Sequence, residues 1–225
     1  MKKYVVFILF AGFLSVTAAQ DRVQNLGDVS EIKIFNGLSI KIERSDEAKV
    51  EITGKKADDV VIKNVDGTLK LSLKLPEIFN SDDVSITVFY KDDLKIIDAN
   101  EGSVIISKEP IDQEKLTLKV QEGAYIKTPL KTKYLDIKAV SGGSIEVTGS
   151  TENQNVDVNT GGVYEAYDLQ STYADVNAAS GGRAEVTVSN LLDAKVNFGG
   201  SIYYKGNPEK VTTKKVLGGN ITNKE

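Results

Sequence analysis

The stretch SGGSIEV, from Ser141 to Val147, places two glycines directly before a run that alternates polar and apolar residues. Such alternation is typical of a β-strand with one buried face. Glycine packs no side chain and loses the most backbone freedom on ordering, so a glycine pair weakens a strand. The pair nevertheless recurs in the stretches TGGVYEA, SGGRAEV, FGGSIYY and LGGNITN. This recurrence predicts a repeated backbone geometry that requires glycine.

The second position of the pair recurs about every 20 residues, a period typical of stacked repeats. It is occupied by Gly102, Ala124, Gly143, Gly162, Gly182, Gly200 and Gly219. Two residues later the aligned column reads Val104, Ile126, Ile145, Tyr164, Ala184, Ile202 and Ile221. Six residues before it stand Ile96, Leu118, Ile137, Val156, Val176, Ala194 and Thr213. We interpret these mostly apolar columns as side chains that face a common core.

The columns predict an all-β fold, a right-handed β-solenoid (β-helix) with coils of about 20 residues. One coil cannot bury its apolar face alone, so stacking on its neighbours builds the core. At a sharp corner, side chains of neighbouring coils would collide and a positive φ is favoured, which explains the glycines. A phosphate-binding loop is disfavoured, because neither Lys-Ser/Thr nor a helix follows the glycines.

The same register does not extend before Leu94. We therefore expect residues 28–90 to form N-terminal β-strands, either irregular opening coils or a cap that covers the end of the stack. The glycine-paired solenoid repeats are expected to span 91–225.

The first 19 residues have the layout of a secretory signal peptide. Lys2 and Lys3 precede an apolar run from Tyr4 to Val16, and Thr17-Ala18-Ala19 offers a cleavage site. The run is shorter than the roughly 20 apolar residues that span a bilayer. The sequence thus predicts export to the periplasm, the cell surface or the medium, with no membrane insertion after cleavage.

The amino-acid composition excludes several kinds of catalytic and metal site. The chain has no histidine and no cysteine, which excludes Ser-His-Asp and Cys-His nucleophile systems and ordinary zinc sites. Its net charge of -4 disfavours nucleic acid as a partner. We expect no catalytic residue, no metal and no cofactor.

The stretches FNGLSIKI, KVEITG, NVDGTLKLSLK and GGSIYYKG resemble the bacterial family of putative auto-transporter adhesins with a head GIN domain. The resemblance covers roughly residues 30–222. It implies an exported β-helical protein with an adhesin-like role.

Candidate binding residues lie in a column that faces outward, three residues after the glycine position. The column contains Lys127, Glu146, Glu165, Glu185 and Tyr203, and Tyr125 also points outward by alternation. Stacked glutamates are expected to raise one another's pKa unless cations compensate. A second outward column contains Asp136, Asn155, Asp175 and Asp193. These columns are either an ordinary solvated face or a linear surface for a polysaccharide or another cell-surface polymer.

Three functions remain open from the sequence. The first is a non-catalytic adhesin-like or polymer-binding module of the bacterial envelope. The second is a carbohydrate-active enzyme, a pectinase-like β-helix that uses outward carboxylates. The third is a structural envelope component without a ligand.

Overall fold

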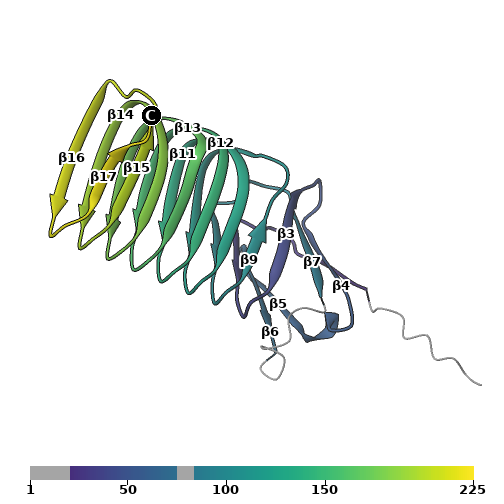
Figure 1. Cartoon of the computed structure of the whole chain (residues 1–225). Helices are drawn as coiled ribbons and strands as arrows, with labels where there is room; N and C mark the ends of the chain where they lie inside the picture. Colours follow the sequence, from purple (N-terminus) through teal and green to yellow (C-terminus); the bar gives the residue numbers. More distant parts are fainter. Residues whose placement is uncertain (1–20, 75–83) are drawn as a thin grey trace, which may run out of the picture.

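A computed structural model describes residues 21–74 and 84–225. It confirms an all-β solenoid, with about 7 turns and coils of roughly 19 residues (Figure 1). All strands of the described part belong to one continuous sheet that winds around a single apolar core. The predicted signal peptide, residues 1–19, lies outside the described residues.

The regular part of the stack is built from parallel strands, each paired with the equivalent strand of the next coil (Figure 1). In the middle of the stack, the residues between two successive glycine corners form one long strand that bends around the core. The strands are β8 (Ile96–Ala99), β9 (Val104–Ile106), β10 (Ile111–Val120), β11 (Tyr125–Ala139), β12 (Ser144–Val158), β13 (Val163–Ala179), β14 (Arg183–Asn197), β15 (Ser201–Lys205), β16 (Lys210–Val216) and β17 (Asn220–Asn223).

The N-terminal strands stack in an order that differs from their order in the chain. β2 (Glu31–Ile34) and β3 (Ser39–Arg44) pair in parallel with β8 and β9 on one side, and with β6 (Thr68–Leu73) and β7 (Ser85–Tyr90) on the other. Antiparallel strands lie at the far end: β5 (Val60–Val65) pairs with β6, β4 (Lys49–Thr53) with β7, and β1 (Arg22–Asn25) with β4. A short 3-10 helix, η1 (Ala57–Asp59), connects β4 to β5. The same core therefore continues from the antiparallel end into the regular coils.

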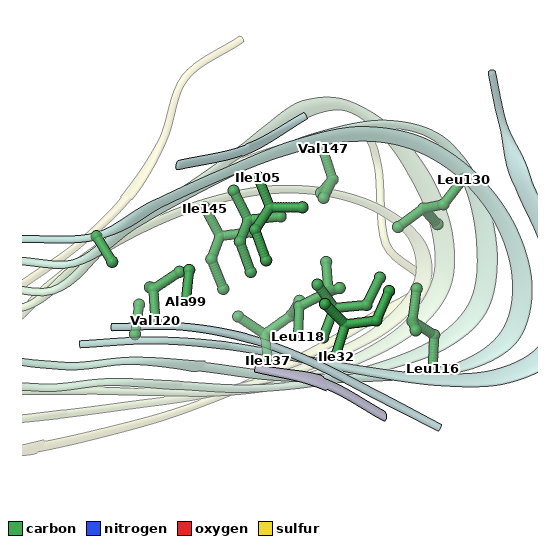
Figure 2. Packing of buried hydrophobic residues seen from close by; sticks show 14 of the residues in the cluster. Ile32, Ala99, Ile105, Leu116, Leu118, Val120, Leu130, Ile137, Ile145 and Val147 are labelled. Carbon is green, nitrogen blue, oxygen red and sulfur yellow. The ribbon is translucent and has the colours of Figure 1, made fainter. Parts of the chain in front are cut away.

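The strand register confirms the predicted columns from β10 onward. Ile137 pairs with Leu118 in one neighbouring coil and with Val156 in the other. Ile145 pairs with Ile126, and all five side chains are buried. Figure 2 shows these ladders from close by, with Leu118 and Ile137 on one wall of the core and Ile105 and Ile145 on the opposite wall.

The predicted register of the first coil is wrong by one residue. Ile105, not Val104, occupies the column of Ile126, and Ile97, not Ile96, pairs with Leu118. Gly102 therefore corresponds to the first residue of the glycine pair, and Ser103 occupies the second position. The slip arose because the alignment matched glycine with glycine.

The two glycines of a pair are required for different reasons. At one corner Thr160 (φ 50°) and Gly161 (φ 72°) form the left-handed part of the turn. Gly162 does not have a left-handed conformation. A Cβ atom on Gly162 would, however, lie well within 3.0 Å of the backbone oxygen of Ala139, which is closer than Cβ atoms approach other atoms in real proteins. The expected positive φ at the second position is thus wrong except at Gly219 (φ 116°). At Gly162, Gly182 and Gly200, close approach to the backbone of the neighbouring coil excludes a side chain, whereas Ser103 and Ala124 occupy this position in the first coils.

Candidate functional site

The structure brings five of the six predicted site residues into one row, which we call the glutamate column. Neighbouring strands β11 to β15 contribute one residue each, and each pairs in register with the next. The column consists of Lys127, Glu146, Glu165, Glu185 and Tyr203. The sixth residue, Tyr125, lies beside the column. Its hydroxyl group donates a hydrogen bond to Glu146 Oε2.

Cations and hydrogen bonds neutralise much of the repulsion in the glutamate column. Lys127 Nζ lies 2.7 Å from Glu146 Oε1. Arg183 projects from the adjacent column, with Nη1 at 3.6 Å from Glu165 Oε1 and Nη2 paired with Glu185 Oε1. The hydrogen bonds from Lys127 and then from Tyr125 lower the pKa of Glu146. The sequence predicted a raised pKa for the stacked glutamates unless cations compensate. Such cations are present, and the pKa of Glu146 is lowered instead of raised.

Arg183 is the residue of this surface that sequence reasoning missed. It stands two residues before Glu185, and residues two apart in a strand face the same side of the sheet. That spacing was the available signal. Lys127, the cation that the sequence places in the column itself, stands at one end of the row.

Tyr203, at the end of the glutamate column, does not offer an open apolar platform. Lys224 Nζ lies 4.8 Å from the centroid of its ring, within cation–π range. Nearby, Lys205 Nζ lies 4.4 Å from the ring of Tyr167. A shallow hollow of about 280 Å³ lies between Tyr167 and the glutamates. This surface is chiefly charged, and the rings of Tyr203 and Tyr167 contact lysines.

The pKa of Glu146 gives a test of this surface. A carboxyl whose folded pKa is lowered stabilises the fold above its ordinary pKa of 4.5, and the contribution is lost as the pH falls through the folded value. Glu146→Gln is therefore expected to lower the urea midpoint relative to wild type at pH 7, and the difference is expected to shrink between pH 5 and pH 3. In a Lys127→Gln background the difference is expected to be smaller at pH 7. Equal pH dependence of wild type and Glu146→Gln would contradict the assigned contacts.

A larger groove of about 490 Å³ lies on another part of the solenoid surface, across the same strands β11 to β14. We call it the tyrosine groove. One wall is the row Tyr134, Asn153, Tyr173 and Leu191, and the other is the predicted outward row Asp136, Asn155, Asp175 and Asp193. The sequence indicated the acidic row but not the tyrosine row, which lies two residues earlier in each of the four strands and therefore on the same face.

Lysines hold the carboxylates of the tyrosine groove. Lys115 Nζ lies 3.4 Å from Asp136 Oδ2. Lys195 Nζ lies 3.5 Å from both Asp175 Oδ1 and Asp193 Oδ2, and these two carboxylates raise the pKa of Lys195. Asn155 Nδ2 donates a hydrogen bond of 3.3 Å to Asp136 Oδ1. The polar wall is thus a pre-arranged row of oxygen acceptors.

A half-buried carboxylate lies outside both surfaces. Burial raises the pKa of Asp98 on β8, while Asn100 donates a hydrogen bond of 3.2 Å to its Oδ1. Asp98 pairs in register with Lys33 and Lys119. Within residues 21–74 and 84–225, no group of acidic side chains could hold a metal ion. In the same ranges, no helix is long and apolar enough to cross a membrane.

Solved structures from Bacteroides and Parabacteroides species have a similar fold. A putative adhesin from Bacteroides fragilis superposes with a TM-score of 0.79 at 21% identity, over 92% of this chain and 97% of that one. A putative adhesin from Parabacteroides distasonis gives 0.73 at 21% identity, over 91% and 96%. A putative lipid binding protein from Parabacteroides distasonis gives 0.68 at 23% identity, over 92% and 98%. At these identities the likeness concerns the fold.

Sequence comparison gives the family. No curated protein matches this chain. The family described as "Putative auto-transporter adhesin, head GIN domain" matches residues 28–208, which include β2 to β15 and thus the coils that carry both surfaces. The chain belongs to this adhesin-like family.

Proposed function

We propose that the protein is an exported, non-catalytic adhesin-like module of the bacterial envelope that binds a polymer along the outside of its solenoid. The observation that carries this proposal is the tyrosine groove, whose two walls repeat with the coils across β11 to β14. A repeating surface can contact successive units of a repeating ligand in similar ways. Family membership supports the adhesin-like role and export.

The electrostatics favour binding over hydrolysis. A glycoside-cleaving enzyme uses a carboxylic acid of raised pKa next to the scissile bond, together with a second carboxylate. In the glutamate column the pKa of Glu146 is lowered instead. In the tyrosine groove, Asp136, Asp175 and Asp193 form ion pairs with lysines. Asp98, whose pKa is raised, lies outside both surfaces.

A polysaccharide array paired with a reducing-sugar assay on the same polymers tests this function. We expect binding to at least one polymer without release of reducing ends. Release of reducing ends would support the pectinase-like alternative. Absence of binding to every polymer on the array would favour a structural component of the envelope.

The glutamate column remains a predicted binding surface, and the same array tests it. Glu165→Gln removes the middle charge and keeps the shape of the side chain. If the column binds polymer, Glu146→Gln, Glu165→Gln and Glu185→Gln are expected to weaken binding. Unchanged affinity of all three variants would remove the column from the site.

A further inference from the structure

We infer that the tyrosine groove is a binding site for a neutral polysaccharide, with sugar rings stacked on Tyr173 and Tyr134 and hydroxyl groups bonded to the opposite polar wall. This inference rests on the proposed polymer-binding function and names the ligand class and the site. It adds residues that the sequence did not select, because the tyrosine wall was not among the predicted site residues.

The aromatic wall provides two accessible rings at a fixed spacing. Tyr134 and Tyr173 are 41% and 40% exposed, and both pair in register with Asn153 on the strand between them. Two strand spacings separate them by roughly 10 Å. Tyrosine combines a flat apolar face with a polar tip, and the C–H face of a pyranose ring can pack on such a surface. The spacing allows two rings of one chain to be contacted.

The two tyrosines differ in how freely their rings are available. Lys133 Nζ lies 5.4 Å from the centroid of the Tyr134 ring, near the outer limit of a cation–π contact. Among residues 21–74 and 84–225, Tyr173 has no such contact. Tyr173 also stands near the middle of the groove, between Asn153 and Leu191. We therefore assign Tyr173 as the main stacking platform.

The polar wall suits hydroxyl groups better than anionic groups. Its carboxylates accept hydrogen bonds, and Asn155 can both donate and accept. The three carboxylates of this wall already pair with Lys115 and Lys195. Lys133 and Lys210 stand at the tyrosine row, so the charges around the groove nearly cancel. A polymer of uronic acids or phosphates would compete with the aspartates for these lysines, whereas a neutral hexose or pentose polymer donates its hydroxyl hydrogens and displaces no ion pair.

The groove has a defined length along the stack. Its volume of about 490 Å³ lies within the range of roughly 300–1,000 Å³ that is typical of ligand sites. The tyrosine row ends at a lysine on both sides, because Lys115 pairs with Tyr134 and Lys210 pairs with Leu191. From β11 to β14 the walls span three strand spacings, roughly 14 Å. This length accommodates a short segment of a polymer, so affinity is expected to rise from monosaccharide to oligosaccharide.

Affinity gel electrophoresis of the mature chain tests the site. The gels contain hydroxyethylcellulose, mannan or xylan as neutral probes and polygalacturonate as the anionic probe. Wild type is expected to be retarded by at least one neutral polymer and not by polygalacturonate. Tyr173→Ala is expected to weaken the affinity measured from retardation roughly fivefold to tenfold, which corresponds to the loss of one aromatic contact. The double variant Tyr134→Ala/Tyr173→Ala is expected to weaken it more than either single change.

Controls separate stacking from folding and from the loss of any exposed ring. Tyr173→Phe keeps the ring and is expected to retain binding. Phe198→Ala removes a ring that is 58% exposed and lies outside both surfaces, and it is also expected to retain binding. Thermal unfolding of each variant confirms that the fold is kept, since the exchanged side chains are partly exposed.

The outcomes distinguish this inference from the proposed function. If wild type binds a neutral polymer and the double tyrosine variant binds it equally well, the groove assignment is wrong while polymer binding stands. Retardation by polygalacturonate alone would also overturn the neutral-ligand assignment and leave polymer binding intact. If no polymer retards the wild type, both the function and the site are refuted.

Discussion

Gly162→Ala is expected to destabilise the solenoid by about 3 kcal/mol, the upper end of the usual range for overpacking, although it adds a single methyl group. The new Cβ would collide with the backbone oxygen of Ala139 in the preceding coil. A side-chain clash can be relieved by a change of rotamer, but a clash with a backbone oxygen requires two paired coils to separate. Urea unfolding of the variant and the wild type measures the effect.

Gly161→Ala is the matched control for this prediction, because it adds the same methyl group one residue earlier. A Cβ on Gly161 meets nothing within 4 Å, and its cost comes only from φ 72°. That cost is about 1–2 kcal/mol for a left-handed alanine. If Gly162→Ala were no more destabilising than Gly161→Ala, close approach would not be the reason for the second glycine.

The regular coils could be predicted from the sequence because two periods agree there. Alternation sets which residues face the core, and the recurrence near 19 residues places equivalent residues on top of one another. The alignment of the repeats is wrong at the first coil because a serine, not a glycine, occupies the second corner position there. This residue, Ser103, is small and has 0% exposure. The apolar pairing of Ile105 with Ile126 gives the correct register. Side-chain burial was thus a more reliable guide than the identity of the corner residue.

The N-terminal end could not be predicted in the same way. β2 and β3 lie between strands that follow them in the chain, with β8 and β9 on one side and β6 and β7 on the other. A period read along the sequence assumes that consecutive coils are spatial neighbours, and this assumption fails here. Pairing between distant segments depends on which apolar faces remain uncovered, and local alternation does not show that.

The candidate surfaces were predicted in part for a related reason. The register of the columns placed Glu146, Glu165 and Glu185 correctly, because it follows from the repeat. The contacts made by Arg183 depend on the direction of a long side chain into the next column. The hollow beside Tyr134 and Tyr173 depends on the shape of the whole face. Column membership can therefore be predicted from the sequence, but grooves and ion pairs between columns require the structure.

Ile137→Ala is expected to lower the free energy of unfolding by about 2–5 kcal/mol, from lost apolar burial and the cavity that remains. Ile137 is 3% exposed and stacks between Leu118 and Val156 of the neighbouring coils (Figure 2). Because each coil contacts only its neighbours, the cavity weakens two interfaces of the stack. Lys138→Ala, at the exposed next position, is expected to change stability by less than about 0.5 kcal/mol, and Ile137→Val to cost about 0.5–1.5 kcal/mol. Urea midpoints and slopes of the three variants check this order, and equal midpoints for Ile137→Ala and Lys138→Ala would contradict the inward assignment of the column.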